Sequence, residues 1–167
     1  MVDDIFSAFD LEKADGYRSF LMAQAGALLP VERALDLAGA DDVMPDWPHR
    51  RRASMLLADL EDLGADAPSF TAPAPALGTR EEILGALYVI EGSRLGGAML
   101  ERRVPAGLPR RFLGSADSAR WRGLVAMIDE MVVSDVQRER AVRTARAVFG
   151  LFATAGRAQS RAACLEY

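Results

Sequence analysis

Three glycines in the middle of a strongly helical segment are the most chemically distinctive feature of the sequence. Gly92, Gly96 and Gly97 follow the apolar run Leu84–Ile90. Each glycine costs roughly 1 kcal/mol relative to alanine inside a helix, so their presence needs a compensating reason. Because Gly92 and Gly96 are four residues apart, they share a face and predict a shallow trough of bare backbone. A flat ligand could lie in this trough, or a neighbouring helix could pack closely there.

Polar residues next to the first glycine add some chemistry, but they do not make a hydrolytic or di-metal site. Ser93 can donate and accept hydrogen bonds, and we expect Glu91 to be a carboxylate on the helix face at the pocket rim rather than a buried acid. His49 is the only histidine. This excludes Ser-His-Asp and Cys-His catalysis and a ferritin-like pair of Glu-x-x-His motifs. We expect His49 itself to lie at the surface near a helix N-terminus.

The elements that must position these residues are helices. Apolar residues at helical spacing predict helices over about 2–9, 13–29, 31–38, 48–63, 80–104, 119–133 and 135–158. Sustained alternation of apolar and polar residues, which would indicate strands, is not found. The sequence therefore predicts an all-α fold, a compact multi-helix bundle of about seven helices, with a single domain over 1–167.

Local signals place several helix ends. Pro30 is expected to interrupt the second helix, and Asp46 is expected to cap the helix that begins near Pro48. Capping boxes are predicted at Thr79–Glu82 and at Ser134–Gln137. Segment 65–78 is rich in proline and alanine and is expected to be a connector, and 159–167 is expected to be a frayed tail.

Composition excludes several classes of protein. The formal net charge of −4 argues against a non-specific nucleic-acid binder, and none of the expected helices has the basic profile of a recognition helix. The basic clusters Arg50–Arg52, Arg102–Arg103 and Arg110–Arg111 are expected to be solvated helix ends. Cys164 is the only cysteine, which excludes an internal disulfide. Without a signal peptide or a long apolar run, we expect a cytoplasmic protein with no membrane span.

The segment Leu84–Gly97 resembles the distal-helix motif of the haem oxygenases. Its sequence is Leu-Gly-Ala-Leu-Tyr-Val-Ile-Glu-Gly-Ser-Arg-Leu-Gly-Gly, and it is most similar to the bacterial, biliverdin-producing branch associated with bacteriophytochromes. Asp15–Phe20, Arg111–Gly114 and Trp121 also sit where that family has similar residues. The resemblance covers nearly the whole chain, and the distal-helix motif is its specific part.

The resemblance implies a reaction and a set of partners. Haem would be both substrate and cofactor, and it would be cleaved to biliverdin, CO and ferrous iron. No flavin or nicotinamide fingerprint occurs in the sequence, so electrons would come from a ferredoxin or a reductase. A bacteriophytochrome is a further candidate partner.

The resemblance also implies roles for individual residues. Gly92, Ser93 and Gly96 would be the catalytic residues of the distal side, where many members have an aspartate in place of Ser93. Haem contacts would come from Gly92, Gly96 and Gly97. Haem propionates need basic side chains, and by position the candidates are Arg18, Arg157 and Arg161.

The proximal ligand of the family, a neutral histidine on the first helix, has no counterpart in this sequence. Counting back from Asp15–Tyr17, the expected histidine falls just before Met1. One interpretation is an upstream start codon and an active enzyme. The other is a non-catalytic protein of the same fold that binds haem, another tetrapyrrole or a signalling partner. We assign no metal ligand, since the replacement candidates are expected to be tail, core or loop residues: Cys164, Tyr17, Met22 and Met44.

Overall fold

The computed structural model describes residues 2–65, 68 and 70–163, and within these ranges it is all-helical, without a strand. Its helices are α1 (Val2–Ser7), α2 (Ala14–Leu37), α3 (Ala40–Val43), α4 (Ala53–Asp62), α5 (Arg80–Glu101), α6 (Ser118–Met131) and α7 (Asp135–Ala163), with 3-10 turns η1 (Trp47–His49) and η2 (Leu113–Ser115). The predicted all-α bundle of seven helices is confirmed for the described residues.

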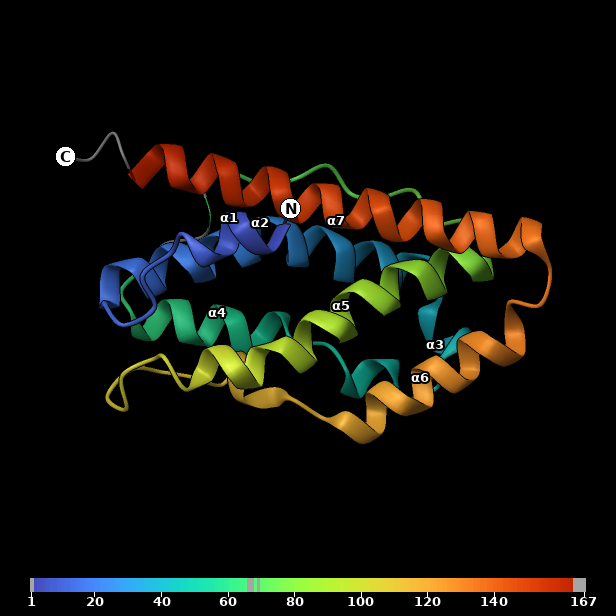
Figure 1. The fold of residues 1–167 in the computed structure, drawn as a ribbon, viewed down its shortest axis with the longest axis horizontal. Helices are drawn as coiled ribbons and strands as arrows, with labels where there is room; N and C mark the ends of the chain where they lie inside the picture. The colour runs from blue at the N-terminus through green and yellow to red at the C-terminus, as the bar shows by residue number, and fades with distance from the viewer. Residues whose placement is uncertain (1, 66–67, 69, 164–167) are drawn as a thin grey trace.

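Helix α5, which carries the glycine segment, contacts most of the other elements of the bundle. α7 runs along one side and packs against α1, α2 and α5, while α5 passes obliquely beneath it (Figure 1). α4 packs on α2, and α6 and η2 flank α5. The core between these layers is apolar and includes the fully buried side chains of Tyr17, Phe20, Trp47 and Leu87.

By length and composition alone, α5 could cross a membrane, with a mean hydropathy of 1.2 in its most apolar window. In the bundle, 56% of that window is buried, and the helix begins with the acidic residues Glu81 and Glu82. Its apolar residues therefore form part of the core of the bundle.

Two predicted capping boxes are confirmed. At the start of α5, the Glu82 N–H donates to Thr79 Oγ1 at 3.4 Å and the Thr79 N–H donates to Glu82 Oε2 at 3.0 Å. At the start of α7, the Gln137 N–H donates to Ser134 Oγ at 3.2 Å and the Ser134 N–H donates to Gln137 Oε1 at 3.0 Å. These reciprocal bonds fix where α5 and α7 begin.

The prediction that Pro30 interrupts the second helix is wrong, because α2 continues through it to Leu37. Proline has no N–H, so the carbonyl of Gly26 loses its donor within the helix. The Ala72 N–H of the connector donates to this carbonyl at 2.8 Å instead. Glycine is needed here, since a Cβ on Gly26 would lie 2.7 Å from the Phe70 carbonyl oxygen.

Two other helix boundaries differ from the prediction. Pro48 belongs to the separate turn η1, and α4 begins only at Ala53. Asp46 therefore does not cap α4. The Asp46 carboxylate instead accepts from Arg50 Nε at 2.8 Å. α7 continues to Ala163, so the expected frayed tail is helical over 159–163, and Cys164 lies outside the described residues. Gly64, in the left-handed conformation with a φ of 63°, follows α4 as expected.

Candidate functional site

An apolar cleft of about 450 Å³ lies between α5, α6 and α7. Its walls include Leu84, Tyr88, Ile128, Val132, Ala145 and Phe149. Tyr88 is 43% exposed and Phe149 is 41% exposed, so aromatic surface is left uncovered along the cleft. Exposed large aromatic side chains that share one concavity are typical of a site for an apolar ligand.

The side of α5 that lines this cleft continues into the glycine segment. Leu84, Tyr88, Gly92 and Gly96 follow one another every four residues and therefore form one stripe along the helix. A Cβ at Gly92 would lie 3.5 Å from the Trp121 ring, and a Cβ at Gly96 would meet nothing within 4 Å. The bare backbone predicted from the sequence is open at Gly96, whereas the Trp121 ring of α6 faces Gly92.

Gly97 faces a different neighbour. It is buried, and a Cβ there would lie 3.1 Å from the carbonyl oxygen of Leu113 in η2. Close packing of η2 on α5 therefore accounts for this glycine, whereas it does not account for Gly96. The ligand contact expected for Gly97 stays a prediction.

Trp121 of α6 lies where the apolar wall meets the bare backbone. Its ring centroid is 5.1 Å from that of Tyr88, with the two rings tilted by 50°. Trp121 also lies against the Cα side of Gly92. The two rings offer an apolar aromatic surface between the cleft and Gly96.

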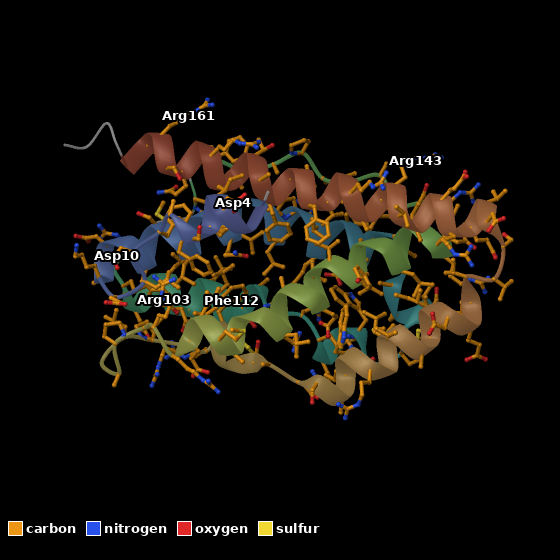
Figure 2. The ribbon with its side chains drawn as sticks, in the orientation of Figure 1. Asp4, Asp10, Arg103, Phe112, Arg143 and Arg161 are labelled. Carbon is orange, nitrogen blue, oxygen red and sulfur yellow. The ribbon has the colours of Figure 1, made fainter. Side chains whose placement is uncertain are left out.

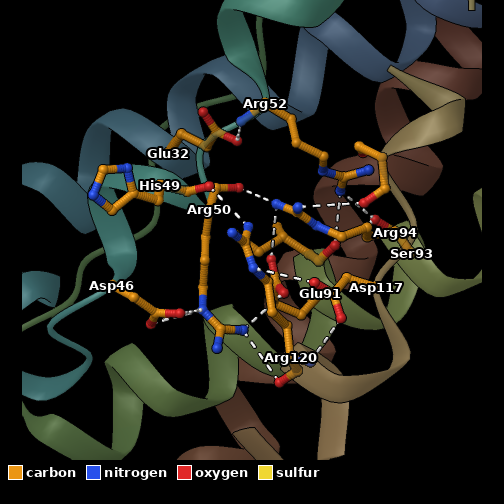
Figure 3. Close-up of polar contacts among 12 residues, drawn as sticks. Glu32, Asp46, His49, Arg50, Arg52, Glu91, Ser93, Arg94, Asp117 and Arg120 are labelled. Carbon is orange, nitrogen blue, oxygen red and sulfur yellow. Dashed lines mark hydrogen bonds and ion pairs between the residues drawn. The ribbon is translucent and has the colours of Figure 1, made fainter. Parts of the chain in front are cut away.

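The opposite side of α5 carries buried charges, shown in Figure 3. Glu91 is 2% exposed and pairs with Arg50 Nη1 at 3.0 Å and with Arg94 Nη2 at 3.1 Å. The expectation that Glu91 lies at a pocket rim is wrong. Arg94 also donates to the Arg50 carbonyl, so this cluster joins α5 to the turn that precedes α4.

The expectation that Arg50–Arg52 forms a solvated helix end is also wrong for two of its three residues. Arg50 and Arg52 are buried and only Arg51 is exposed. Because the helix begins at Ala53, residues 50–52 precede it and their side chains alternate between the interior and the solvent. Arg50 and Arg52 are thus site-forming residues that helical periodicity missed. Glu91 and Arg94 at i,i+3 in an apolar helix were the available signal.

Arg52 contacts the glycine segment directly. Its Nη2 donates to the Ile90 carbonyl at 2.7 Å and to Ser93 Oγ at 2.9 Å, and Ser93 Oγ in turn donates to the Ile90 carbonyl at 2.8 Å. The guanidinium also lies 4.7 Å from the centroid of the Phe112 ring. Burial, and then the nearby Arg94, lower the pKa of Arg52 to about 10, so it remains charged at neutral pH.

Glu32 of α2 supports Arg52 from behind. Its carboxylate accepts from the N–H of Arg52 at 2.7 Å and from the N–H of Ala53 at 3.0 Å. Burial raises the pKa of Glu32, although both backbone bonds act against this change. Two donors at the start of α4 are satisfied in this way.

The structure does not bring the three predicted propionate ligands to this cleft. Arg18 pairs with Asp15 at 2.9 Å in the first turn of α2. Arg157 and Arg161 are exposed on the C-terminal part of α7, and Figure 2 shows Arg161 at that end, away from Arg143. The basic side chains that do line the cleft are Arg138 and Arg146.

The chain's only histidine does not line the cleft. His49 is exposed in η1, as predicted, and its carbonyl accepts from Arg120 Nη1 at 2.9 Å. Tyr17 and Met44 are fully buried, as expected for core residues. Across the described part of the chain, no three His, Cys, Asp or Glu side chains gather as a metal site would require.

Comparison with known proteins gives two informative matches. A protein named haem oxygenase from Xanthomonas campestris pv. campestris (strain 8004) is 34% identical over 142 residues, which cover 75% of this chain and 84% of that protein. The fold is similar to that of the NO- and CO-bound haem oxygenase from Neisseria meningitidis. The TM-score is 0.72 at 20% identity, and the match covers 95% of this chain and 83% of that one. A search of protein-family models found no match.

Proposed function

Because this chain belongs to the haem oxygenase family, we propose that it cleaves haem with O2 and externally supplied electrons to biliverdin, CO and ferrous iron. The observation that carries the proposal is the apolar cleft against α5, together with the stripe of this helix that leads from the cleft residues Leu84 and Tyr88 to Gly92 and Gly96. A flat ring can approach a helix closely only where side chains are missing.

The cleft residues fit haem in shape and in charge. Haem is a flat apolar ring with two carboxylates at one edge. Tyr88, Val132 and Phe149 would face the ring, and the exposed Arg138 and Arg146 would pair with the carboxylates. The described cleft residues include no imidazole or thiolate to bind the iron, so the experiment below supplies imidazole as an added ligand.

Bound haem supplies the redox-active iron and is itself the molecule that is oxidised. The residues of the chain orient it and control its surroundings. The apolar walls exclude water from the ring, and the glycines keep side chains out of the distal space. Since the Ser93 hydroxyl donates its proton to Ile90, Ser93 can only accept a hydrogen bond from a group or water in the trough.

Partners follow from the same proposal. The chain carries no flavin or nicotinamide fingerprint, so a ferredoxin or a separate reductase would supply the electrons. A cytoplasmic bacteriophytochrome that takes up biliverdin is a fitting recipient of the product. We place the reaction in the cytoplasm, without a role for nucleic acid or membrane.

The test combines binding and turnover. The purified chain is titrated with ferric haem, with and without imidazole, and a shift of the Soret band relative to the same solution without protein reports binding. Ferredoxin, its reductase and NADPH are then added, and biliverdin and CO are measured. We expect biliverdin in the presence of imidazole. Haem binding without biliverdin would favour the non-catalytic alternative, and a Soret band that the protein does not shift would overturn the proposal.

A matched pair of variants locates the site. Gly96→Leu fills the trough at a position where an added side chain meets open space, and Gly123→Leu does the same on the exposed part of α6. We expect Gly96→Leu to lose haem binding and Gly123→Leu to retain it, while both remain folded by circular dichroism.

A further inference from the structure

Arg52 differs from the other two buried arginines near Gly92 in what it binds. Arg50 and Arg94 both form ion pairs with Glu91. The guanidinium of Arg52 instead binds a carbonyl and a hydroxyl, and Glu32 and Glu91 act on its charge only through space. Its positive charge is thus less neutralised than theirs, and its two oxygen partners, on Ile90 and Ser93, flank Gly92.

The bonds of Arg52 also determine what Ser93 can do. A serine hydroxyl has one proton and two lone pairs. The proton is donated to the Ile90 carbonyl at 2.8 Å, and one lone pair accepts from Arg52 at 2.9 Å. One lone pair remains for a further partner, and since Ser93 and the exposed Gly96 are three residues apart on α5, the hydroxyl lies on the face of the helix that carries Gly96. Ser93, which is itself exposed, therefore presents an acceptor there and not a donor.

Arg52 is held from two sides, so this arrangement is rigid. Its backbone N–H is fixed by Glu32, and its guanidinium stacks on Phe112 at 4.7 Å. Phe112 is in turn held by the fully buried Asp59 of α4, which accepts from its N–H at 2.9 Å. A functional group supported by such a second layer of contacts keeps its position when a ligand binds.

We propose that Arg52 is a positioning residue for the distal side of the haem site, where it fixes a buried positive charge and an acceptor-only Ser93 hydroxyl beside Gly92. This inference rests on the proposed haem-binding function. A fixed cation at this place favours an anionic ligand in the trough over a neutral one of similar size. It acts through Ser93 and the backbone of Ile90, without touching the haem.

The test uses protein loaded with ferric haem alone, without the imidazole of the turnover assay, and compares two added ligands, anionic azide and neutral imidazole, each titrated by absorption. Arg52→Met removes the charge, Arg52→Lys keeps it, and Arg51→Gln is the exposed neighbouring control. We expect Arg52→Met to weaken azide about tenfold, the effect of removing one partly screened charge, and to leave imidazole affinity unchanged. Arg52→Lys should stay close to wild type for azide, and Arg51→Gln should match wild type for both.

Equal losses for azide and imidazole in Arg52→Met, or no loss for azide, would overturn the inference and leave Arg52 as a packing residue. If Arg52→Met does not fold, the same comparison is made between Arg52→Gln and Arg52→Lys.

A second measurement needs no haem and separates this inference from the proposed function. In the haem-free protein, amide hydrogen exchange over 90–97 should be faster in Arg52→Met than in Arg51→Gln, because Ile90 and Ser93 lose their tether. Equal exchange would overturn the inference. If Arg52→Met exchanges faster than Arg51→Gln but the wild-type protein binds no haem, the proposed function is overturned, while the tether of Ile90 and Ser93 by Arg52 is confirmed.

Discussion

On one side of Gly92, α5 is joined to the turn before α4 by buried ion pairs and hydrogen bonds, and on the other it faces an open apolar cleft. The first side holds Arg50, Arg52 and Glu91, all at most 6% exposed. The second side exposes Tyr88 and leaves Gly96 without a neighbour. Glycines on one face of a helix make fewer contacts there than residues with side chains. The contacts of the charged face must therefore hold the backbone of α5 in place.

The largest effect should come from breaking the charged face at its centre. Glu91→Ala leaves the buried Arg94 without its carboxylate and Arg50 with only that of Asp46, and removing one partner of a buried pair typically costs about 3–5 kcal/mol. Urea unfolding followed by circular dichroism measures the loss. The control is Glu130→Ala on the exposed part of α6, which should change stability by less than about 0.5 kcal/mol. A similarly small loss for Glu91→Ala would mean that the charged face does not hold α5.

The second-largest effect on stability should come from Gly85, which packs closely against α7 on the cleft side of α5. A Cβ at Gly85 would lie 2.3 Å from the Ala141 carbonyl oxygen of α7. Gly85→Ala should therefore push α7 away from α5 and cost about 1–3 kcal/mol, as overpacked core substitutions do. The same alanine at Gly123, where nothing lies within 4 Å, should not destabilise. A neutral Gly85→Ala would show that α5 and α7 can separate freely.

The open part of the cleft should respond in the opposite direction. Gly96→Ala meets no neighbour, so the better helix propensity of alanine should stabilise the fold by about 0.5–1 kcal/mol. The same methyl group narrows the trough, so haem affinity should fall. Gly123→Ala is the matched control and should give the stability without the loss of affinity. Thermal unfolding measures the change in stability, and haem titration measures the change in haem affinity. An unchanged haem affinity in Gly96→Ala would show that Gly96 does not belong to the site.

The smallest effect should be found at the start of α5, which belongs to neither face. Hydrogen bonds from the backbone of Gly78, then from Thr79, hold the pKa of Glu82 below 4.5, its ordinary value. An acid with a lowered pKa in the folded state stabilises the protein above its unfolded pKa, and this stability is lost as the pH falls through the folded pKa. Glu82→Gln should therefore flatten the decline of stability below pH 4.5. Urea midpoints measured between neutral and acidic pH test this, and an unchanged slope would contradict it.

The comparison also shows which parts of the structure a sequence can predict. The all-helical character of the chain and both capping boxes depend on residues three or four apart, and these predictions are confirmed for the described residues. The stripe of Gly92 and Gly96 was likewise visible as a local pattern. The burial of Arg50 and Arg52 could not be seen in this way, because it depends on Glu91 and Ile90 of α5, far along the chain, and on where α4 begins.

Two other differences have the same origin. A proline inside a helix is tolerated only if another donor reaches the orphaned carbonyl, and for Pro30 that donor is Ala72, distant in sequence. For the haem propionates, family position indicates Arg157 and Arg161, which do not line the cleft, so their role stays a prediction. Arg138 and Arg146 share a stripe of α7 with Val142, which also lines the cleft, and this spacing was a signal available in the sequence.

The bond from Ala72 to Gly26 determines where this chain can be lengthened. An insertion that moves Ala72 away from α2 would leave the buried Gly26 carbonyl without a donor. An insertion beside Gly107, an exposed turn residue with open space around it, breaks no such bond. Tags and fused domains therefore belong in the turn after α5, and not beside Ala72 in the proline- and alanine-rich stretch that precedes this helix.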